Sequence, residues 1–355
     1  MTDAHTRVTA KASGMPHRRR ARVALCTAAA LLLTVVLWTG VAQAAPQAVS
    51  YSVITLPGAG YQSIYDFIAG AKKSIEITVY ALSDTKAQEA LKAAAKRGVK
   101  VRVLLNSSTE GGAAGKTMSQ TAYDDLTANG VAVRWAWSGT LWHQKTIVRD
   151  GTAAAIMTCN LYSPYYAVVR DYVVFTTNRT TAQGIQATFN IDWNNTDRAP
   201  VAGVAPAGSE LVWSPGAEPA LLRLIDSARP GTTIYIEDEQ LASDPLEQAL
   251  IAAVDRGVTV DFLMTYDPAF KDGLDTLAAG GVDVRILEGY FPLYIHAKVV
   301  SVNGETIFVG STNLTSLMTD KNRNVGIITR DSGVVEGITS TIATDFAGAV
   351  PYTTP

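Results

Sequence analysis

Two short motifs carry the histidine and lysine side chains that could do chemistry in this chain. The first is His143-Gln144-Lys145 and the second is His296-Ala297-Lys298, and each runs into an apolar stretch typical of a strand. Because alternate side chains of a strand share a face, each histidine should project beside its lysine. Apart from His5 and His17 near the N-terminus, the chain has no other histidine, so imidazole chemistry must use these two motifs.

Each motif is followed by a turn and then by an asparagine, at the same spacing in both halves. Asp150-Gly151 and Asn303-Gly304 are typical of two-residue hairpin turns with positive φ at both positions. A hairpin of this kind brings the strand after the turn back beside the histidine. It places four polar side chains near the two histidines, namely Thr158, Asn160, Ser311 and Asn313.

This set of groups suits phosphoryl transfer. Lysine ammonium groups and asparagine amides can hold phosphate oxygens and neutralise the charge that develops in the transition state. A neutral histidine can attack phosphorus, while a protonated one gives a proton to the leaving alcohol. A single HxK in a strand is weak evidence, but two with equal spacing to an asparagine are not. We expect no metal and no cofactor, because the sequence has no cluster of carboxylates or histidines with ligand spacing.

The paired motifs resemble those of the phospholipase D superfamily. The resemblance covers essentially the whole chain after its N-terminal segment, and it is specific for the superfamily but not for a substrate. It implies cleavage of phosphodiesters in two steps through a phosphohistidine, often with transfer to an alcohol. It also implies catalytic roles for His143, Lys145, His296 and Lys298, and substrate binding by Asn160, Asn313, Thr158 and Ser311.

The family usually has an acidic residue 28 positions after the motif histidine. That position is Asp171 in the first half and Asn324 in the second. A carboxylate that accepts a hydrogen bond from one imidazole nitrogen orients the ring and stabilises its cation. We therefore predict that Asp171 orients His143 and that Asn324 orients His296. On this basis His143 is the nucleophile and His296 is the general acid.

The elements that position the motifs repeat as well. Each half has the order strand, helix, strand: 75–82, 86–96 and 99–105, then 234–236, 246–255 and 258–264. Both helices end in Arg-Gly, which is typical of a helix C-terminus, and alternating strands and helices indicate an α/β fold. We predict two pseudo-symmetric phospholipase D-like lobes, each a mixed β-sheet flanked by helices. Lobe 1 covers 45–205 and lobe 2 covers 206–355, with the site between them.

Residues 1–44 have the pattern of an export signal. Four arginines lie between positions 18 and 22, an apolar run covers 23–38, and Ala42-Gln43-Ala44 is typical of a cleavage site. We therefore expect a secreted protein. The alternative is a membrane-anchored protein that keeps this segment, because the apolar run is about long enough to span a bilayer.

Charge bears on the substrate. The full chain has a net charge of −2; without residues 1–44 it has 30 − 6 = 24 basic and 32 − 1 = 31 acidic residues, a net of −7. Phosphate attraction normally needs a basic face, so nucleic acid is the weaker candidate partner.

Aromatic residues flank both motifs and suit a lipid interface or base stacking, although part of them should be core. They are Trp135, Trp137, Trp142, Tyr162, Tyr165, Tyr166, Tyr290, Phe291 and Tyr294. Our first hypothesis is hydrolysis of phosphatidylcholine-like lipids to phosphatidic acid at a membrane surface. The alternatives are a secreted nuclease and a cardiolipin synthase-like phosphatidyltransferase. Intact motifs argue against a non-catalytic binding lobe, and a monomer suffices because one chain holds both half-sites.

Overall fold

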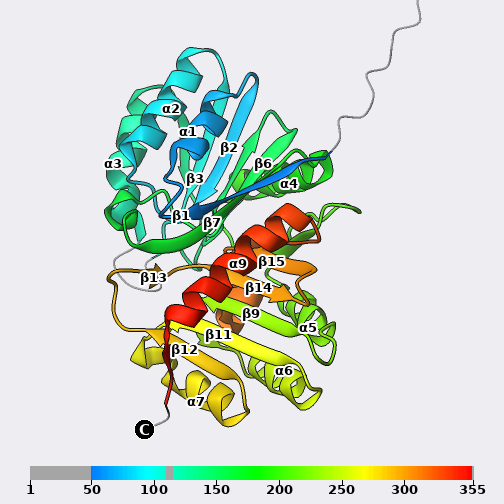
Figure 1. Ribbon diagram of the computed structural model, residues 1–355. Helices are drawn as coiled ribbons and strands as arrows, with labels where there is room; N and C mark the ends of the chain where they lie inside the picture. Colours follow the sequence, from blue (N-terminus) through cyan, green and yellow to red (C-terminus); the bar gives the residue numbers. More distant parts are fainter. Residues whose placement is uncertain (1–48, 109–114, 354–355) are drawn as a thin grey trace, which may run out of the picture. The chain divides into compact units, whose positions relative to one another are not determined.

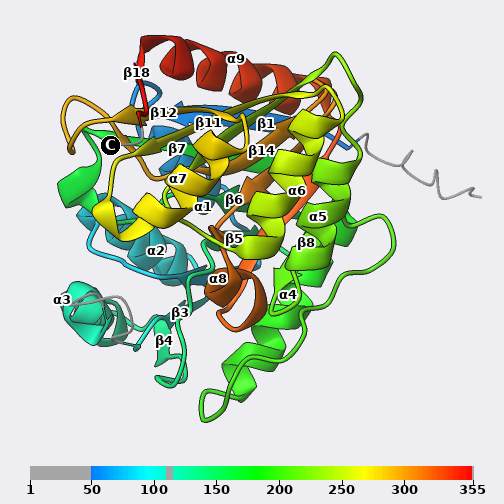
Figure 2. The ribbon, with the colours of Figure 1, turned by 90° about the horizontal axis from the view of Figure 1, so that it is seen from below.

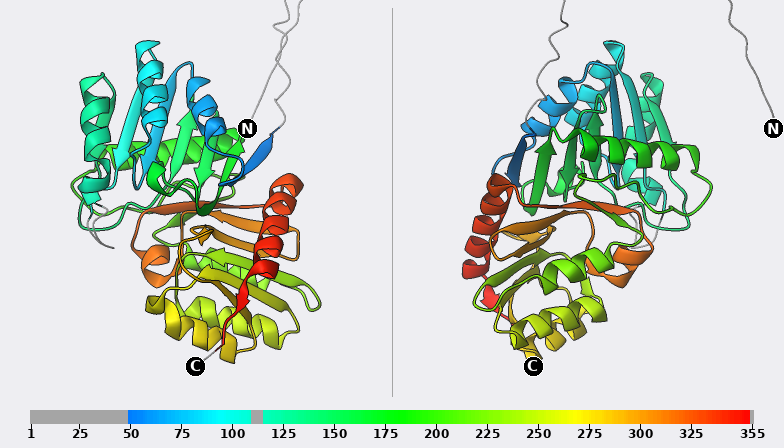
Figure 3. Two further views of the ribbon diagram at one scale, coloured as in Figure 1. Left: turned by 60° about the vertical axis from the view of Figure 1, so that its left-hand side comes forward. Right: turned by 90° about the vertical axis from the view of Figure 1, so that its right-hand side faces the viewer.

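The computed structural model describes residues 49–108 and 115–353, and Ala48–Pro355 form one compact unit. The predicted signal segment 1–44 lies outside the described residues. Two β-sheets, one from each half of the chain, lie one above the other in this unit (Figure 1). Two further views show the same two layers (Figure 3).

The first lobe is a mixed sheet with strand order β1-β7-β6-β5-β2-β3-β4. Its strands are β1 (Tyr51–Leu56), β2 (Ser74–Val79), β3 (Lys100–Leu105), β4 (Ala132–Trp135), β5 (Thr146–Arg149), β6 (Ala153–Met157) and β7 (Val169–Thr176). Its helices are α1 (Gln62–Ala69), α2 (Thr85–Lys96), α3 (Gly115–Ala128), the 3₁₀ turn η1 (Ser163–Tyr165) and α4 (Arg179–Asn194). Apolar side chains of α1, α2 and α3, such as Ile64, Leu91 and Leu126, form a core with β2 and β3.

The second lobe repeats this sheet, with strand order β18-β12-β11-β9-β14-β15-β17-β8. Its strands are β8 (Leu211–Ser214), β9 (Thr233–Asp238), β11 (Thr259–Thr265), β12 (Asp283–Leu287), β14 (Lys298–Val302), β15 (Thr306–Gly310), β17 (Asn324–Thr329) and β18 (Val350–Pro351). Three short strands lie outside it: β10 (Leu241–Ala242), β13 (Tyr294–Ile295) and β16 (Leu314–Thr315). Its helices are α5 (Glu218–Asp226), α6 (Asp244–Asp255), the 3₁₀ turn η2 (Pro268–Phe270), α7 (Lys271–Ala279), α8 (Ser316–Asp320) and α9 (Ser332–Gly348).

The two lobes meet through a shared apolar core. Helices α5, α6 and α7 cover one side of the second sheet and α9 covers the other (Figure 2). Between the sheets, Val148 and Ile156 of the first lobe belong to the same cluster as Val299 and Val309 of the second. Read in opposite directions, the two strand orders superimpose from β1 with β8 to β4 with β12. The prediction of two pseudo-symmetric lobes with mixed sheets and flanking helices is confirmed.

The hairpins after the two motifs differ from the prediction by one residue. The predicted turns are present, because Asp150 and Gly151 both have positive φ, as do Asn303 and Gly304. The ladders, however, pair Thr146 with Ile156 and Val299 with Val309, which is one position later than a two-residue loop allows. Each hairpin therefore holds one extra residue after the turn, as in a bulge.

The helices of residues 49–108 and 115–353 include none that is both long and apolar enough to cross a membrane. Helix α4 ends at Asn194, β8 begins at Leu211, and the segment between them contains no strand or helix.

Candidate active site

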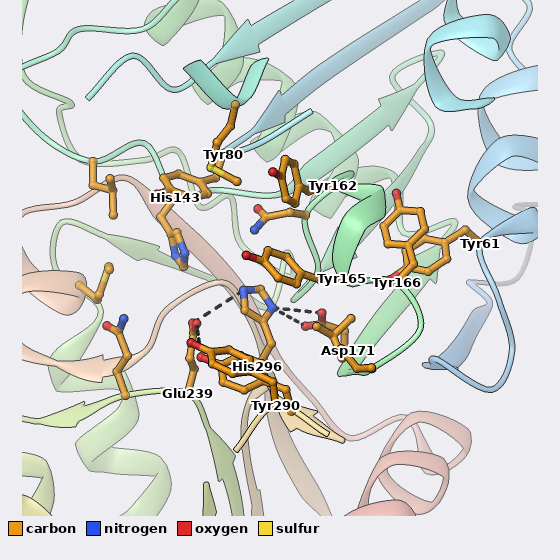
Figure 4. Close-up of a pocket in the computed structure, with 18 residues that line it drawn as sticks. Tyr61, Tyr80, His143, Tyr162, Tyr165, Tyr166, Asp171, Glu239, Tyr290 and His296 are labelled. Carbon is orange, nitrogen blue, oxygen red and sulfur yellow. Dashed lines mark hydrogen bonds and ion pairs between the residues drawn. The ribbon is translucent and has the colours of Figure 1, made fainter. Parts of the chain in front are cut away.

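Both motif histidines line one pocket of about 300 Å³. Figure 4 shows His143 and His296 in this pocket together with Asp171 and Glu239. Seven tyrosines complete most of its wall: Tyr61, Tyr80, Tyr162, Tyr165, Tyr166, Tyr290 and Tyr294. The pocket thus combines residues that lie more than 150 positions apart in the sequence.

His143 is held by the second lobe. Its backbone N–H donates to the carbonyl of Arg323 (2.9 Å), the residue just before β17. Its Nδ1 lies 2.9 Å from the carbonyl oxygen of Ser311 and 3.1 Å from Oδ1 of Asn324. The Asn324 amide is oriented by its Nδ2, which donates to the Met318 carbonyl (2.9 Å). Since both neighbours of Nδ1 are acceptors, Nδ1 carries the proton and Nε2 keeps a free lone pair.

His296 is held by the first lobe in the same way. The strand β13, just before it, pairs in parallel with β7, and the His296 N–H donates to the Arg170 carbonyl (3.2 Å). Its Nδ1 lies 2.9 and 3.0 Å from the two oxygens of Asp171. Its Nε2 lies 3.7 Å from Oε2 of Glu239. A dashed line marks this ion pair in Figure 4. The His296 ring therefore lies between two carboxylates, Asp171 at Nδ1 and Glu239 at Nε2.

The predicted orienting pairs are therefore wrong, because each histidine is oriented by the other lobe. Asp171 contacts His296 instead of His143, and Asn324 contacts His143 instead of His296. The physical reason is the pseudo-twofold arrangement of the lobes. The His296 motif follows β13, which pairs with β7 of the first lobe, and the backbone of His143 bonds to Arg323, just before β17 of the second lobe. A spacing of 28 residues places the partner correctly on β7 or β17 but does not say which histidine it meets.

Thr158 and Ser311 also differ from the prediction that they bind substrate. The Thr158 hydroxyl donates to Oδ1 of Asp171, and the Ser311 hydroxyl donates to Oδ1 of Asn324 (3.1 Å). Both side chains are fully buried. Their hydroxyls thus support the two orienting residues and are already engaged before substrate arrives.

The electrostatics of the two histidines differ. Burial lowers the pKa of His143 well below its usual value, and the nearby Lys145 and Lys298 lower it further. The neutral form that an attacking imidazole needs is therefore favoured at His143, even in mildly acidic solution. The low pKa of His143 supports its predicted role as the nucleophile, and this support does not depend on Asp171.

Both motif lysines are buried beneath the pocket. Lys145 Nζ donates to the His143 carbonyl (2.8 Å), and Lys298 Nζ donates to the His296 carbonyl and to Glu239 (2.8 Å). Burial lowers the pKa of Lys145 well below its usual value, and Lys298 lowers it further. Burying a cationic ammonium group costs free energy, and an anionic phosphate bound close to the lysines would offset that cost.

The two motif asparagines have buried side-chain atoms without a hydrogen-bond partner. Among the described residues, Oδ1 of Asn160 and both polar side-chain atoms of Asn313 are buried without a hydrogen-bond partner. The NH2 groups of the two amides can donate hydrogen bonds to the oxygens of a phosphate, whereas the Oδ1 atoms can only accept them.

Glu239 is a site residue that the sequence analysis missed. It follows β9 directly, and β9 lies beside the strand β14 that carries Lys298. Desolvation raises the pKa of Glu239, but Lys298, His296 and His143 outweigh it and lower the pKa well below its usual value. A signal was present in the sequence, since three consecutive acidic residues, 237–239, end an otherwise apolar strand.

The flanking aromatic residues divide between pocket and core. Five of the nine line the pocket, namely Tyr162, Tyr165, Tyr166, Tyr290 and Tyr294, whereas Trp142 is fully buried in the core. Two of the pocket tyrosines are largely exposed, Tyr165 (52%) and Tyr290 (59%), and so is Phe291 (77%), the residue after Tyr290. An exposed aromatic rim around a pocket is typical of a binding surface.

Arg323 fastens the backbone that holds His143. Its guanidinium is fully buried, and Nη2 contacts Oδ1 of Asp192 (2.9 Å) on α4 and the Val201 carbonyl (2.8 Å). It also lies over the rings of Trp142 (5.6 Å) and Trp213 (5.5 Å). These contacts join α4 of the first lobe to β8 and β17 of the second.

We expect Arg323→Leu to lower the free energy of unfolding by about 3–5 kcal/mol, because it leaves Asp192 buried without its cation. Burial already raises the pKa of Asp192 to about 6 despite Arg323. Its folded-state pKa thus exceeds the unfolded value, so the carboxylate costs stability as pH rises through 6, and the deficit should shrink at pH 5. Urea unfolding at both pH values measures this. The exposed Arg330→Leu should change stability by about 0.5 kcal/mol or less, and an equal loss in both variants would contradict the account.

No group of three or more histidine, cysteine, aspartate or glutamate side chains within residues 49–108 and 115–353 is placed to hold a metal ion.

The fold and the paired HxK site define an enzyme of the phospholipase D superfamily. The family described as "Cardiolipin synthase, PLD-like domain" matches residues 64–193 and 221–347, so this chain belongs to that family. The matched residues include both motifs.

A curated relative is similar in sequence, and solved structures share the fold. The probable cardiolipin synthase YwiE of Bacillus subtilis (strain 168) is 28% identical over 145 residues, which are 41% of this chain and 29% of that protein. The aligned part thus spans less than a third of that relative. The phosphatidylserine synthase of Haemophilus influenzae Rd KW20 has the same fold, with a TM-score of 0.61 at 12% identity over 82% of this chain and 85% of the other. The polyphosphate kinase of Porphyromonas gingivalis also has a TM-score of 0.61, at 16% identity over 83% and 50%.

The family and the curated relative bear on the choice between hydrolysis and transfer. Membership of the phospholipase D superfamily is confirmed. Head-group hydrolysis, which the sequence analysis placed first, is less well supported than the cardiolipin synthase-like alternative.

Proposed function

We propose that this protein transfers a phosphatidyl group from one alcohol to another through a phosphohistidine, in the manner of a cardiolipin synthase. The observation that carries the reaction type is the unlike pair of histidines in one pocket. His143 is neutral with a free Nε2, and His296 is flanked by carboxylates. The family description and the named relative support a phosphatidyl group as the group transferred.

In the first step, Nε2 of His143 attacks phosphorus and forms a P–N bond while the P–O bond to the leaving alcohol breaks. The imidazolium of His296 gives its Nε2 proton to the departing oxygen. Lys145, Lys298 and the amides of Asn160 and Asn313 hold the non-bridging oxygens. The Ser311 carbonyl and Asn324 accept the Nδ1–H of His143 and stabilise the positive charge on its ring.

In the second step, the neutral His296 takes the proton of an incoming alcohol, whose oxygen attacks phosphorus as the P–N bond breaks. His143 returns to its neutral form and His296 to its cation, so protons and charge balance over the cycle. The choice of alcohol over water is supported by the family description and by the named relative, a probable cardiolipin synthase.

A lipid surface is supported by the aromatic rim of Tyr165, Tyr290 and Phe291. Tyrosine and phenylalanine suit the boundary between water and acyl chains. The rim segments 160–169 and 287–297 contain no lysine or arginine, in contrast to a nucleic-acid groove. We place this activity outside the cytoplasm, following the predicted export signal, and we propose that a monomer suffices.

The test is an assay of residues 45–355 on vesicles of phosphatidylglycerol and phosphatidylcholine with EDTA, beside His143→Ala. We expect cardiolipin and free glycerol to exceed phosphatidic acid, with no product from the variant. Phosphatidic acid alone would contradict transfer and favour hydrolysis. Cleavage of DNA without any lipid product would contradict the lipid substrate.

A further inference from the structure

Glu239 makes the two half-sites unequal. Its Oε2 accepts from Lys298 Nζ (2.8 Å) and lies 3.7 Å from Nε2 of His296. Its Oε1 accepts from the hydroxyl of Tyr294 (3.1 Å). The carboxylate is therefore held in place beside His296 in the pocket, as Figure 4 shows.

The first lobe has a neutral group at the equivalent position. Lys298 pairs with Asp238 across β14 and β9, and Glu239 is the next residue. Continuing the ladder of β5 and β2 by one step beyond Thr146 and Thr78 places Lys145 opposite Val79, so the next residue is Tyr80. The Tyr80 ring lies 5.1 Å from the His143 ring and 5.3 Å from Lys145 Nζ.

Tyr80 carries no charge at neutral pH. Burial raises its pKa to about 12, and the nearby Glu239 contributes. The neighbouring Asp238 is also driven towards its neutral form, because burial raises its pKa well above the usual value. Glu239 is thus the charged carboxylate on the side of the pocket formed by β9.

The charges around the phosphate position can be counted. With a phosphate bound, the proposed mechanism requires Lys145, Lys298 and His296 to be cationic. The two carboxylates in contact with this set are Asp171 and Glu239. His143 is neutral. The balance is one positive charge, which matches the single negative charge of a phosphodiester. Without Glu239 the balance would be two, which matches the dianion of a phosphomonoester.

We propose that Glu239 is a specificity-determining residue that adjusts the pocket to monoanionic diesters and weakens its binding of dianionic monoesters. The inference rests on the proposed phosphoryl transfer and adds to it. It explains how the site avoids capture by phosphatidic acid or inorganic phosphate, which carry a second negative charge near neutral pH. Each negative charge on the ligand is repelled by the carboxylate, so a dianion loses about twice as much binding free energy as a monoanion.

The test compares two ligands that share an aryl group and differ by one charge, phenyl phosphate and methyl phenyl phosphate, titrated calorimetrically into the full chain at pH 8. In Glu239→Gln we expect the Kd of phenyl phosphate to fall about tenfold more than that of methyl phenyl phosphate. This change is a fraction of the Coulomb repulsion between two unit charges about 5 Å apart. Glu239→Asp keeps the charge and should keep the discrimination. The exposed Glu288→Gln, outside the pocket lining, controls for a general change in the charge of the protein.

Equal changes for both ligands in Glu239→Gln, or loss of discrimination in Glu239→Asp, would overturn the proposal. Thermal unfolding of each variant verifies that the protein is folded. Because the titration needs no turnover, it is independent of the lipid assay. Discrimination without lipid products would contradict the proposed substrate and leave the role of Glu239 standing.

Discussion

His143→Asn is expected to abolish turnover of every phosphodiester substrate, by about 10⁴-fold or more, because the variant lacks its nucleophile. His296→Asn is expected to behave differently with a p-nitrophenyl diester. That leaving group needs no proton, so His143 can still attack and release p-nitrophenol once. The second step then stalls, since no base activates the acceptor.

Stopped-flow absorbance distinguishes the two variants. His296→Asn should give a burst of about one equivalent of p-nitrophenol per site, and His143→Asn should give none, as covalent catalysis in two steps requires. With an alkyl diester, neither variant should turn over. A burst from His143→Asn in place of His296→Asn would reverse the proposed roles.

Asp171→Asn is expected to lower kcat/KM by about 10²–10⁴-fold, the range found when a carboxylate that orients a histidine is neutralised. The carboxylate oxygen lies 2.9 Å from Nδ1 of His296 and so orients the ring that gives its Nε2 proton to the leaving group. Thr158→Val should have a smaller effect, because it removes a hydroxyl that supports Asp171 and leaves the charge in place.

Asn324→Asp introduces a carboxylate at the equivalent position beside His143. Its effect is expected in the pH dependence of kcat/KM. A carboxylate beside Nδ1 would raise the pKa of His143, which burial and two lysines hold well below its usual value. The wild type should remain active as pH falls below about 6.5, the ordinary value for histidine, since His143 stays neutral there. Asn324→Asp should lose activity at a higher pH on the acid side. Profiles of kcat/KM from pH 5 to 9 test this, and coincident acid limbs would contradict the assignment of Asn324 to His143.

The fold and the two HxK pairs could be predicted because they repeat. Strand, helix and strand occur in the same order in both halves, and each motif precedes a turn with positive φ at Asp150 or Asn303. Such local patterns depend on the residue types at neighbouring positions, which can be identified in the sequence. Placing both histidines in one pocket then needed only the pseudo-symmetry of the lobes.

The exchange of partners could not be predicted, because it depends on how the lobes dock. Asp171 lies 28 residues after His143 but contacts His296, since β13 adds to the first lobe's sheet beside β7. The hydroxyls of Thr158 and Ser311 contact Asp171 on β7 and Asn324 on β17, and the spacing within each hairpin does not predict these contacts with a neighbouring strand. Glu239 lies outside both HxK motifs and far from them in the sequence. Its contacts with Lys298 and Tyr294 form only in the folded chain.

The most direct test of the account is to trap the covalent intermediate and locate it. The His296→Asn protein is mixed with a p-nitrophenyl diester and quenched in alkali, in which phosphohistidine survives, and its peptides are mapped by mass spectrometry. The account predicts one phosphoryl adduct on the peptide that contains His143. An adduct on any other residue, or a burst of p-nitrophenol without an adduct, would contradict it.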